Sequence, residues 1–114
     1  MAHHILRFRK KDKDTFLAIA RGEKSVETRA ATKRYVGFVE GDTLTFVCGT
    51  LRTTKTILRK KHFKTLAALF RAYAPGRIMP GIKNERELRK MYYSFPQYRE
   101  KLRRYGVIAW ELKR

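Results

Sequence analysis

Several short stretches of the chain alternate between two kinds of side chain, and this pattern restricts the fold more than any other feature of the sequence. Such alternation is typical of strands that bury one face. The expected strands cover residues 5–9, 25–29, 43–48 and 107–112, together with 52–63, where Thr53, Thr54, Thr56 and Ile57 favour a strand over a helix. Glycine, proline and aspartate lie between several of them, as turns require. A β-sheet of short, twisted strands is therefore expected.

Helices are expected where apolar residues recur three or four positions apart. The expected helices cover residues 13–21, 66–73 and 88–95, with a further turn or two over 98–105. Gly22 stands where a left-handed residue would end the first helix, and Thr65 precedes the second as a cap. The apolar side chains at helical spacing in residues 88–95 are interpreted as part of the hydrophobic core.

The resulting order, β-α-β-β-β-α-α-β, defines the expected fold class. Most connections are too short for repeated βαβ crossovers, so a doubly wound sheet is disfavoured. We expect an α+β fold in which a small mixed or antiparallel β-barrel carries flanking helices. The 114 residues suit one domain over 1–114, with a single ordinary core.

Charge indicates the kind of partner. The sequence has 28 Lys and Arg residues against 10 Asp and Glu residues, a formal net charge of +18. The positive electrostatic field of such a charge attracts RNA, DNA, anionic membranes and acidic proteins alike, and the charge carries no information on the fold. No recognition-helix motif for duplex DNA is visible, so RNA is the expected partner.

Several classes of protein and site are disfavoured by the composition. No apolar run reaches the roughly 18–20 residues of a membrane span, and no signal-peptide core follows the N-terminus. A soluble, cytoplasmic protein is expected. Cys48, the single cysteine, is interpreted as a buried strand thiol. Neighbouring His3 and His4 would face opposite sides of a strand, so no metal is expected, and no cofactor is.

Lys24, Glu27 and Arg29 form the most informative polar pattern. On an extended strand, Glu27 and Arg29 project to the same side about 7 Å apart, and Lys24 enters from the preceding turn. The two cations could hold a phosphate or a carbonyl, while Glu27 could bind a base or act as a general base. A surface ion pair, with the strand carrying its charge outward, is the alternative.

Three motifs in this order resemble the ASCH-domain family (activating signal cointegrator homology). They are Gly22-x-Lys24-x-x-Glu27-x-Arg29, Gly41-Asp42-Thr43-Leu44-Thr45-Phe46 and Tyr105-Gly106-Val107-Ile108-Ala109-Trp110-Glu111-Leu112. The similarity runs over nearly the whole chain. It implies a small β-barrel related to the PUA domain, with a cleft for RNA or nucleotide-like ligands lined by Lys24, Glu27 and Arg29.

The resemblance also implies an enzymatic alternative. Some proteins of this fold are amidohydrolases that remove the acetyl group from acetylcytidine with a Lys and a Thr nucleophile, and others resemble ribonucleases. Lys24 matches the Lys, but Glu27 holds the place of the nucleophile. A carboxylate cannot replace the hydroxyl in the same acyl transfer. Thr28 is adjacent and is expected on the opposite face.

Aromatic residues interleaved with cations suggest where RNA would bind. Cations track phosphates while exposed rings stack on unpaired bases. Tyr93 and Tyr98 are the expected stacking residues. The expected phosphate contacts are Arg7, Arg9, Lys60, Lys61, Arg103 and Arg104. For the strip around Lys60 and Lys61, a solvated basic face is an equal alternative.

Three functional hypotheses follow. The first is a module that binds single-stranded or structured RNA, or a nucleotide-like ligand. The second is an enzyme that acts on RNA or a modified nucleoside, with Lys24 and Glu27 as the catalytic residues. The third is a module whose positive field meets an acidic protein partner. The oligomeric state is left open.

Overall fold

The computed structural model describes all residues from 1 to 114. Its strands are β1 (His3–Arg7), β2 (Val26–Ala30), β3 (Thr43–Cys48), β4 (Leu51–Phe63) and β5 (Val107–Leu112). Its helices are η1 (Lys10–Asp12), α1 (Lys13–Ala20), α2 (Leu66–Ala72), α3 (Pro75–Ile78), α4 (Glu85–Ser94) and α5 (Tyr98–Tyr105). The five strands and their order with the main helices confirm the expected α+β class.

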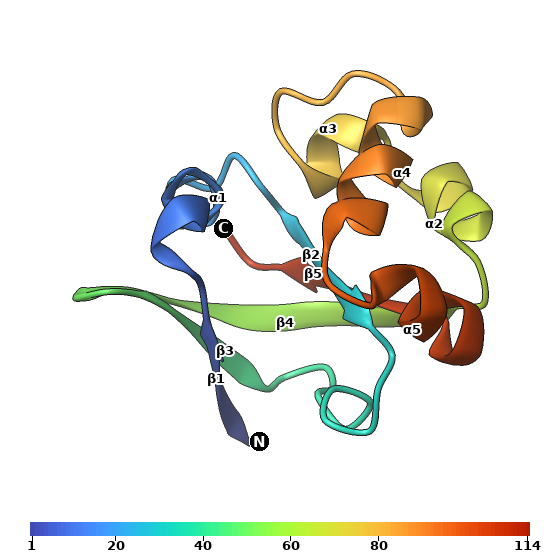
Figure 1. Ribbon diagram of the computed structural model, residues 1–114. Helices are drawn as coiled ribbons and strands as arrows, with labels where there is room; N and C mark the ends of the chain where they lie inside the picture. Colours follow the sequence, from blue (N-terminus) through green and yellow to red (C-terminus); the bar gives the residue numbers. More distant parts are fainter.

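The strands form one curled sheet in the order β1-β3-β4-β5-β2 (Figure 1). The β1–β3 pair is parallel, and the other three pairs are antiparallel. The sheet is therefore mixed, as expected. Strands β1 and β2 are its two edges and do not pair with each other. The expected barrel is thus a half-barrel that stays open between them.

Strand β4 allows the sheet to curl because it serves two partners. Its first half pairs with β3 and its second half pairs with β5, with a register shift between Ile57 and Arg59. An extra residue at such a bulge bends a strand and increases its twist. The bend turns β5 and β2 away from β1.

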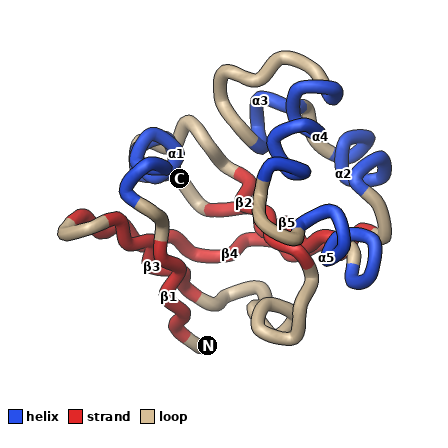
Figure 2. The backbone as a smooth tube through the Cα atoms, in the orientation of Figure 1, coloured by secondary structure: helices blue, strands red, loops and turns tan.

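Apolar clusters cover both faces of the sheet. Inside the half-barrel, Trp110 and Phe46 pack with Phe16 and Ile19 of α1. On the other face, Val107 and Ala109 pack against α2, α3, α4 and α5. Figure 2 shows these helices gathered on one side, apart from α1. Strand β5 is thus buried on both faces, whereas its pattern was expected to bury one face.

The helices between β4 and β5 begin and end at identifiable residues. The Thr65 side chain accepts a hydrogen bond from Ala68 N, which confirms the expected cap, and Asn84 caps α4 in the same way. Helix α3, with Pro75 in its first turn, occupies a stretch expected to be a loop. Gly106 ends α5 with φ of 78°, and a Cβ there would lie 2.4 Å from Phe63 O. The close approach of these two segments therefore requires glycine.

Candidate functional site

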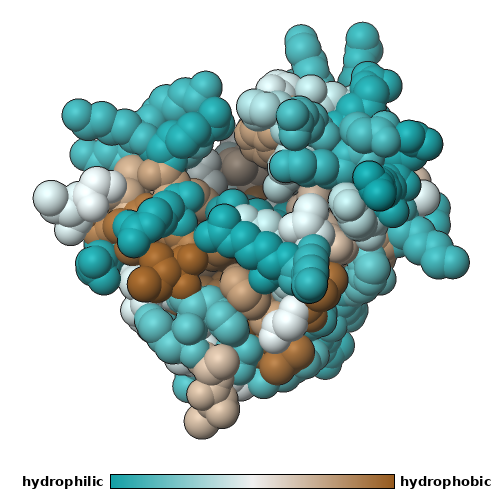
Figure 3. Space-filling model, turned by 60° about the horizontal axis from the view of Figure 1, so that its bottom comes forward, coloured by the Kyte–Doolittle hydropathy of each residue, from teal (hydrophilic) through white to brown (hydrophobic).

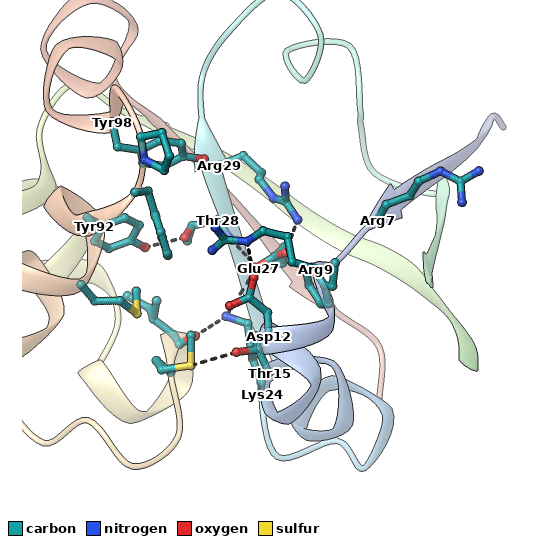
Figure 4. Close-up of a pocket in the computed structure, with 16 residues that line it drawn as sticks. Arg7, Arg9, Asp12, Thr15, Lys24, Glu27, Thr28, Arg29, Tyr92 and Tyr98 are labelled. Carbon is teal, nitrogen blue, oxygen red and sulfur yellow. Dashed lines mark hydrogen bonds and ion pairs between the residues drawn. The ribbon is translucent and has the colours of Figure 1, made fainter. Parts of the chain in front are cut away.

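A pocket of about 310 Å³ lies in the opening between the two edge strands. One wall comes from β1, η1 and α1, the floor from β2, and the opposite wall from α3, α4, α5 and the α4–α5 turn (Figure 4). A recess between two hydrophilic lobes is visible in the space-filling view (Figure 3). The volume lies in the lower part of the range of small-molecule sites. The lining residues are Arg7, Phe8, Arg9, Asp12, Thr15, Lys24, Glu27, Thr28, Arg29, Ile78, Met79, Met91, Tyr92, Phe95, Pro96 and Tyr98.

Strand β2 contributes both of its faces to the pocket because it is an edge strand. Glu27 lies opposite Trp110 in the register with β5, so its side chain points inside the half-barrel. Thr28 points the other way, as expected, and its hydroxyl is hydrogen-bonded to Tyr92. The pocket wraps around the free edge of β2, and Thr28 and Glu27 therefore both line it.

The strand does not carry its charge outward, which corrects the surface alternative. Lys24 is 3% exposed and Glu27 is 5% exposed. The surface alternative assumed that the face of β2 that carries Glu27 is exposed to solvent. Alternation shows which residues share a face of a strand, but it does not show which other elements cover that face. Here β1, η1 and α1 cover that side. Lys24 and Glu27 are buried at the base of the pocket, and Arg29 lies half-buried beside them.

Lys24 is engaged by protein oxygens on three sides. Its Nζ donates to Val26 O at 2.7 Å and to Ile78 O, and it lies 3.5 Å from Glu27 Oε1. Burial lowers the pKa of Lys24, although neighbouring Glu27 opposes the shift. Because two backbone carbonyls hold its donors, Lys24 ties β2 to α3 and leaves little for a ligand.

Glu27 is satisfied by three donors. Its Oε1 accepts from Thr28 N at 3.1 Å and faces Lys24, while its Oε2 accepts from Arg29 at 3.2 Å. A buried carboxylate needs such partners, because burial of an isolated charge is very costly. Glu27 therefore sets the positions of both cations of the trio.

Arg29 is the cation of the trio with hydrogen-bonding capacity to spare. One terminal nitrogen donates to Glu27, whereas a guanidinium carries five N–H donors. The guanidinium also lies 5.5 Å from the centre of the Phe8 ring and 5.8 Å from that of Tyr35. These contacts hold a planar group that is well suited to phosphates and carboxylates.

Aromatic rings form the wall opposite these charges. Tyr92 and Phe95 meet edge to face at 6.4 Å, and Phe95 and Tyr98 do so at 5.3 Å. Burial raises the pKa of Tyr92 and of Tyr98, so both rings stay neutral near pH 7. The Tyr98 hydroxyl accepts from Ala30 N at 3.4 Å on the free edge of β2. Tyr98 therefore reaches the pocket, as its predicted role requires.

The pocket carries an excess of positive charge. Its lining includes four cationic side chains, those of Arg7, Arg9, Lys24 and Arg29, and two carboxylates, those of Asp12 and Glu27. Arg9 pairs with Asp12 at 2.8 Å. Figure 4 shows Arg7 directed away from the other labelled side chains. An anionic group would therefore meet Arg9 and Arg29 first.

Five residues predicted to bind RNA do not line the pocket. Lys60 donates to Val36 O, and Lys61 lies 4.0 Å from Glu111. Arg103 pairs with Glu100 at 2.6 Å, and Arg104 lies over the Tyr105 ring. Tyr93 lies beneath Arg99 on the other side of α4. These residues lie on three different elements, β4, α4 and α5. Binding of RNA by any of them stays a prediction.

Sequence reasoning missed much of the wall that α3 and α4 supply. Tyr92 and Phe95 were interpreted as core, and Asp12 was not among the predicted site residues. Asp12 does precede α1, but its carboxylate makes no capping hydrogen bond and binds Arg9 instead. The cluster of cations and aromatics around residues 89–104 was the one signal that pointed to this region.

The remaining polar clusters have structural partners. His4 Nε2 lies 2.8 Å from Asp42, and His3 is hydrogen-bonded to Thr43 and Thr45. No group of three or more His, Cys, Asp or Glu side chains is placed to hold a metal ion. None of the helices has the length and apolar character needed to cross a membrane.

Comparison with known proteins supports the fold. No protein-family model matches the chain, and no curated protein matches it. The crystal structure of hypothetical protein PH0355 superposes with a TM-score of 0.82 at 21% identity, covering 99% of this chain and 98% of that chain. The solution structure of protein PF0455 from Pyrococcus furiosus gives a TM-score of 0.75 at 20% identity, covering 99% and 96%. At these identities the likeness concerns the fold alone.

Proposed function

We propose that this chain is an ASCH-like module that binds RNA, or a nucleotide-like ligand, in the pocket between β1 and β2. One observation carries the proposal: a positioned guanidinium with spare donors, that of Arg29, faces an aromatic wall across an open pocket. A nucleotide combines the two groups that these features recognise. Its phosphate suits an arginine, and its base suits rings.

Charge and hydrogen bonding support an anionic ligand over a neutral one. The lining has two more cations than carboxylates, and the chain carries a net charge of +18. Arg9 at the rim is half exposed and can reorient toward an entering phosphate. The sequence motifs add support, because Lys24, Glu27 and Arg29, which carry the resemblance to the ASCH family, all line this pocket.

Binding of 5′-mononucleotides and of a short single-stranded RNA to Arg29 variants tests the proposal. Arg29→Lys keeps the charge and loses the planar fork, so we expect roughly tenfold weaker binding by isothermal titration calorimetry. Arg34→Lys is the matched control, since Arg34 lies over the same Tyr35 ring and does not line the pocket.

A change of no more than threefold is expected for the control. Thermal melting of each variant separates a binding defect from unfolding. The proposal is wrong if wild-type protein binds neither ligand, or if folded Arg29→Lys binds as the control does.

A hydrolase acting on RNA or on a modified nucleoside is the second candidate. It is favoured by the buried Lys24, whose pKa burial lowers, beside Glu27 in a pocket. The Lys24 contacts with Val26 O and Ile78 O argue for a structural role instead. Incubation of RNA and of acetylcytidine with wild type and Glu27→Gln discriminates the two. Turnover that Glu27→Gln abolishes, with ligand affinity retained, would establish catalysis.

A further inference from the structure

A second strongly charged feature lies on the outer face of α4, opposite the face that helps to line the pocket. It is a shallow depression lined by Arg86, Arg89, Lys90, Tyr93, Ser94 and Arg99. We refer to these six residues as the α4 patch. Four of them are cations and none is a carboxylate. We propose that the α4 patch binds phosphates of a single-stranded RNA whose nucleotide occupies the pocket, an inference that rests on the proposed function.

The cations of the α4 patch are not neutralised by the protein. None of the four forms an ion pair, although Glu85 and Glu87 lie on the same helix. Arg86 and Lys90 are one helical turn apart, where like charges repel and destabilise a helix. By contrast, Arg103 on α5 pairs with Glu100. An external anion would relieve the repulsion in the patch.

Aromatic rings hold two of these guanidinium groups in place. Arg99 lies 4.2 Å from the centre of the Tyr93 ring, and Arg89 lies 5.3 Å from that of Phe70. Stacking of this kind leaves the edge of the guanidinium, which carries its donors, open to solvent. Two guanidinium groups held by rings, beside the two exposed cations Arg86 and Lys90, match a row of phosphates better than a single small anion.

The position and composition of the patch favour nucleic acid over a membrane. Met91 and Tyr92 line the pocket, whereas Tyr93 and Ser94 line the patch, so the two sites are separated by the width of α4. A single-stranded RNA that leaves the pocket can pass over the α4–α5 turn to the α4 patch. No large exposed apolar side chain belongs to the patch. Basic helical surfaces that insert into membranes usually carry such residues.

The double variant Arg86→Gln/Lys90→Gln tests the inference in the full chain. Arg21→Gln/Arg71→Gln is the matched control, because it removes the same charge from exposed positions outside the pocket and the patch. Affinity for a labelled single-stranded RNA of about twelve nucleotides is measured by anisotropy over a range of salt concentrations. Affinity for a 5′-mononucleotide is measured in parallel.

We expect the patch variant to bind the RNA roughly tenfold more weakly than the control, with the salt slope reduced by about 1.4 for two lost phosphate contacts. Its mononucleotide affinity should fall no further than that of the control. Equal RNA affinities for the patch and control variants would overturn the inference. So would a patch defect seen only with anionic lipid vesicles or with an acidic peptide.

The Arg29→Lys variant separates this inference from the proposed function. If it keeps full affinity for mononucleotide and RNA while the patch variant loses affinity for RNA, the pocket proposal fails and the patch remains a phosphate site. If Arg29→Lys weakens both ligands and the patch variant behaves as the control, the pocket stands and the patch is excluded.

Discussion

The pocket base and the α4 patch use the same kind of charge in opposite ways. Lys24 and Arg29 are largely buried, share Glu27 and are held by carbonyls or rings. Arg86 and Lys90 are exposed and form no ion pair. Buried, satisfied cations fix geometry, and their loss damages the protein itself. Exposed, unpaired cations add little to stability and remain available to a polyanion. Net charge alone therefore does not show which lysines and arginines are available to bind a polyanion.

The sharpest test of this difference is stability. Lys24→Met should lower the free energy of unfolding by about 3 kcal/mol, because Glu27 and two carbonyls would lose a buried partner. Lys90→Met, the matched change on the α4 patch, should stay within about 0.5 kcal/mol of wild type. Urea denaturation monitored by Trp110 fluorescence measures both. Similar small losses for the two variants would contradict the structural role given to Lys24.

A second test uses pH at the aromatic wall of the pocket. Tyr92→Phe removes the hydroxyl bound to Thr28 and should cost about 1 kcal/mol at pH 7. Burial raises the pKa of Tyr92 in the folded protein above its unfolded value of about 10. The unfolded state then loses its proton first, so the stabilising effect of this phenol is present below pH 10 and declines above it. The stability advantage of wild type over Tyr92→Phe should therefore decrease as the pH rises above 10. An advantage of wild type that increases with pH in this range would be inconsistent with a buried neutral phenol.

The smallest predicted effect is a gain in stability at the α4 patch. Arg86→Gln/Lys90→Gln should raise the free energy of unfolding by up to about 0.5 kcal/mol at low salt, since it removes a repulsive pair on one helix face. High salt should abolish the gain by screening the repulsion in wild type. Denaturation at low and high salt measures it. A clear loss of stability would indicate that these cations have protein partners.

The helices and strands were predictable where the sequence patterns that indicate them are local. The alternation in 43–48 and 107–112 and the caps at Gly22 and Thr65 depend on neighbours in sequence. The open edge between β1 and β2 was not predictable, because it follows from the bend of β4 and from the long helical segment before β5. The burial of Glu27 is likewise a long-range effect.

The candidate site was predictable in part for the same reason. The spacing of Lys24, Glu27 and Arg29 brought three residues of one short segment together. It could not show that Lys24 donates hydrogen bonds to two backbone carbonyls, one of them Ile78 O from a helix distant in sequence. Nor could it show that Lys60 and Arg103 face elsewhere, since charge pattern carries no information on direction.

Mapping of a bound 5′-mononucleotide by amide chemical shifts tests the central claim most directly. The pocket extends from β1 across β2 to the α4–α5 turn, and the largest saturable changes are predicted at residues 27–30 and 95–98, with smaller changes at 8–12. Arg29→Lys should require a higher nucleotide concentration to produce them. Changes confined to residues 86–90, or absent at millimolar nucleotide, would contradict a nucleotide site between the two edge strands.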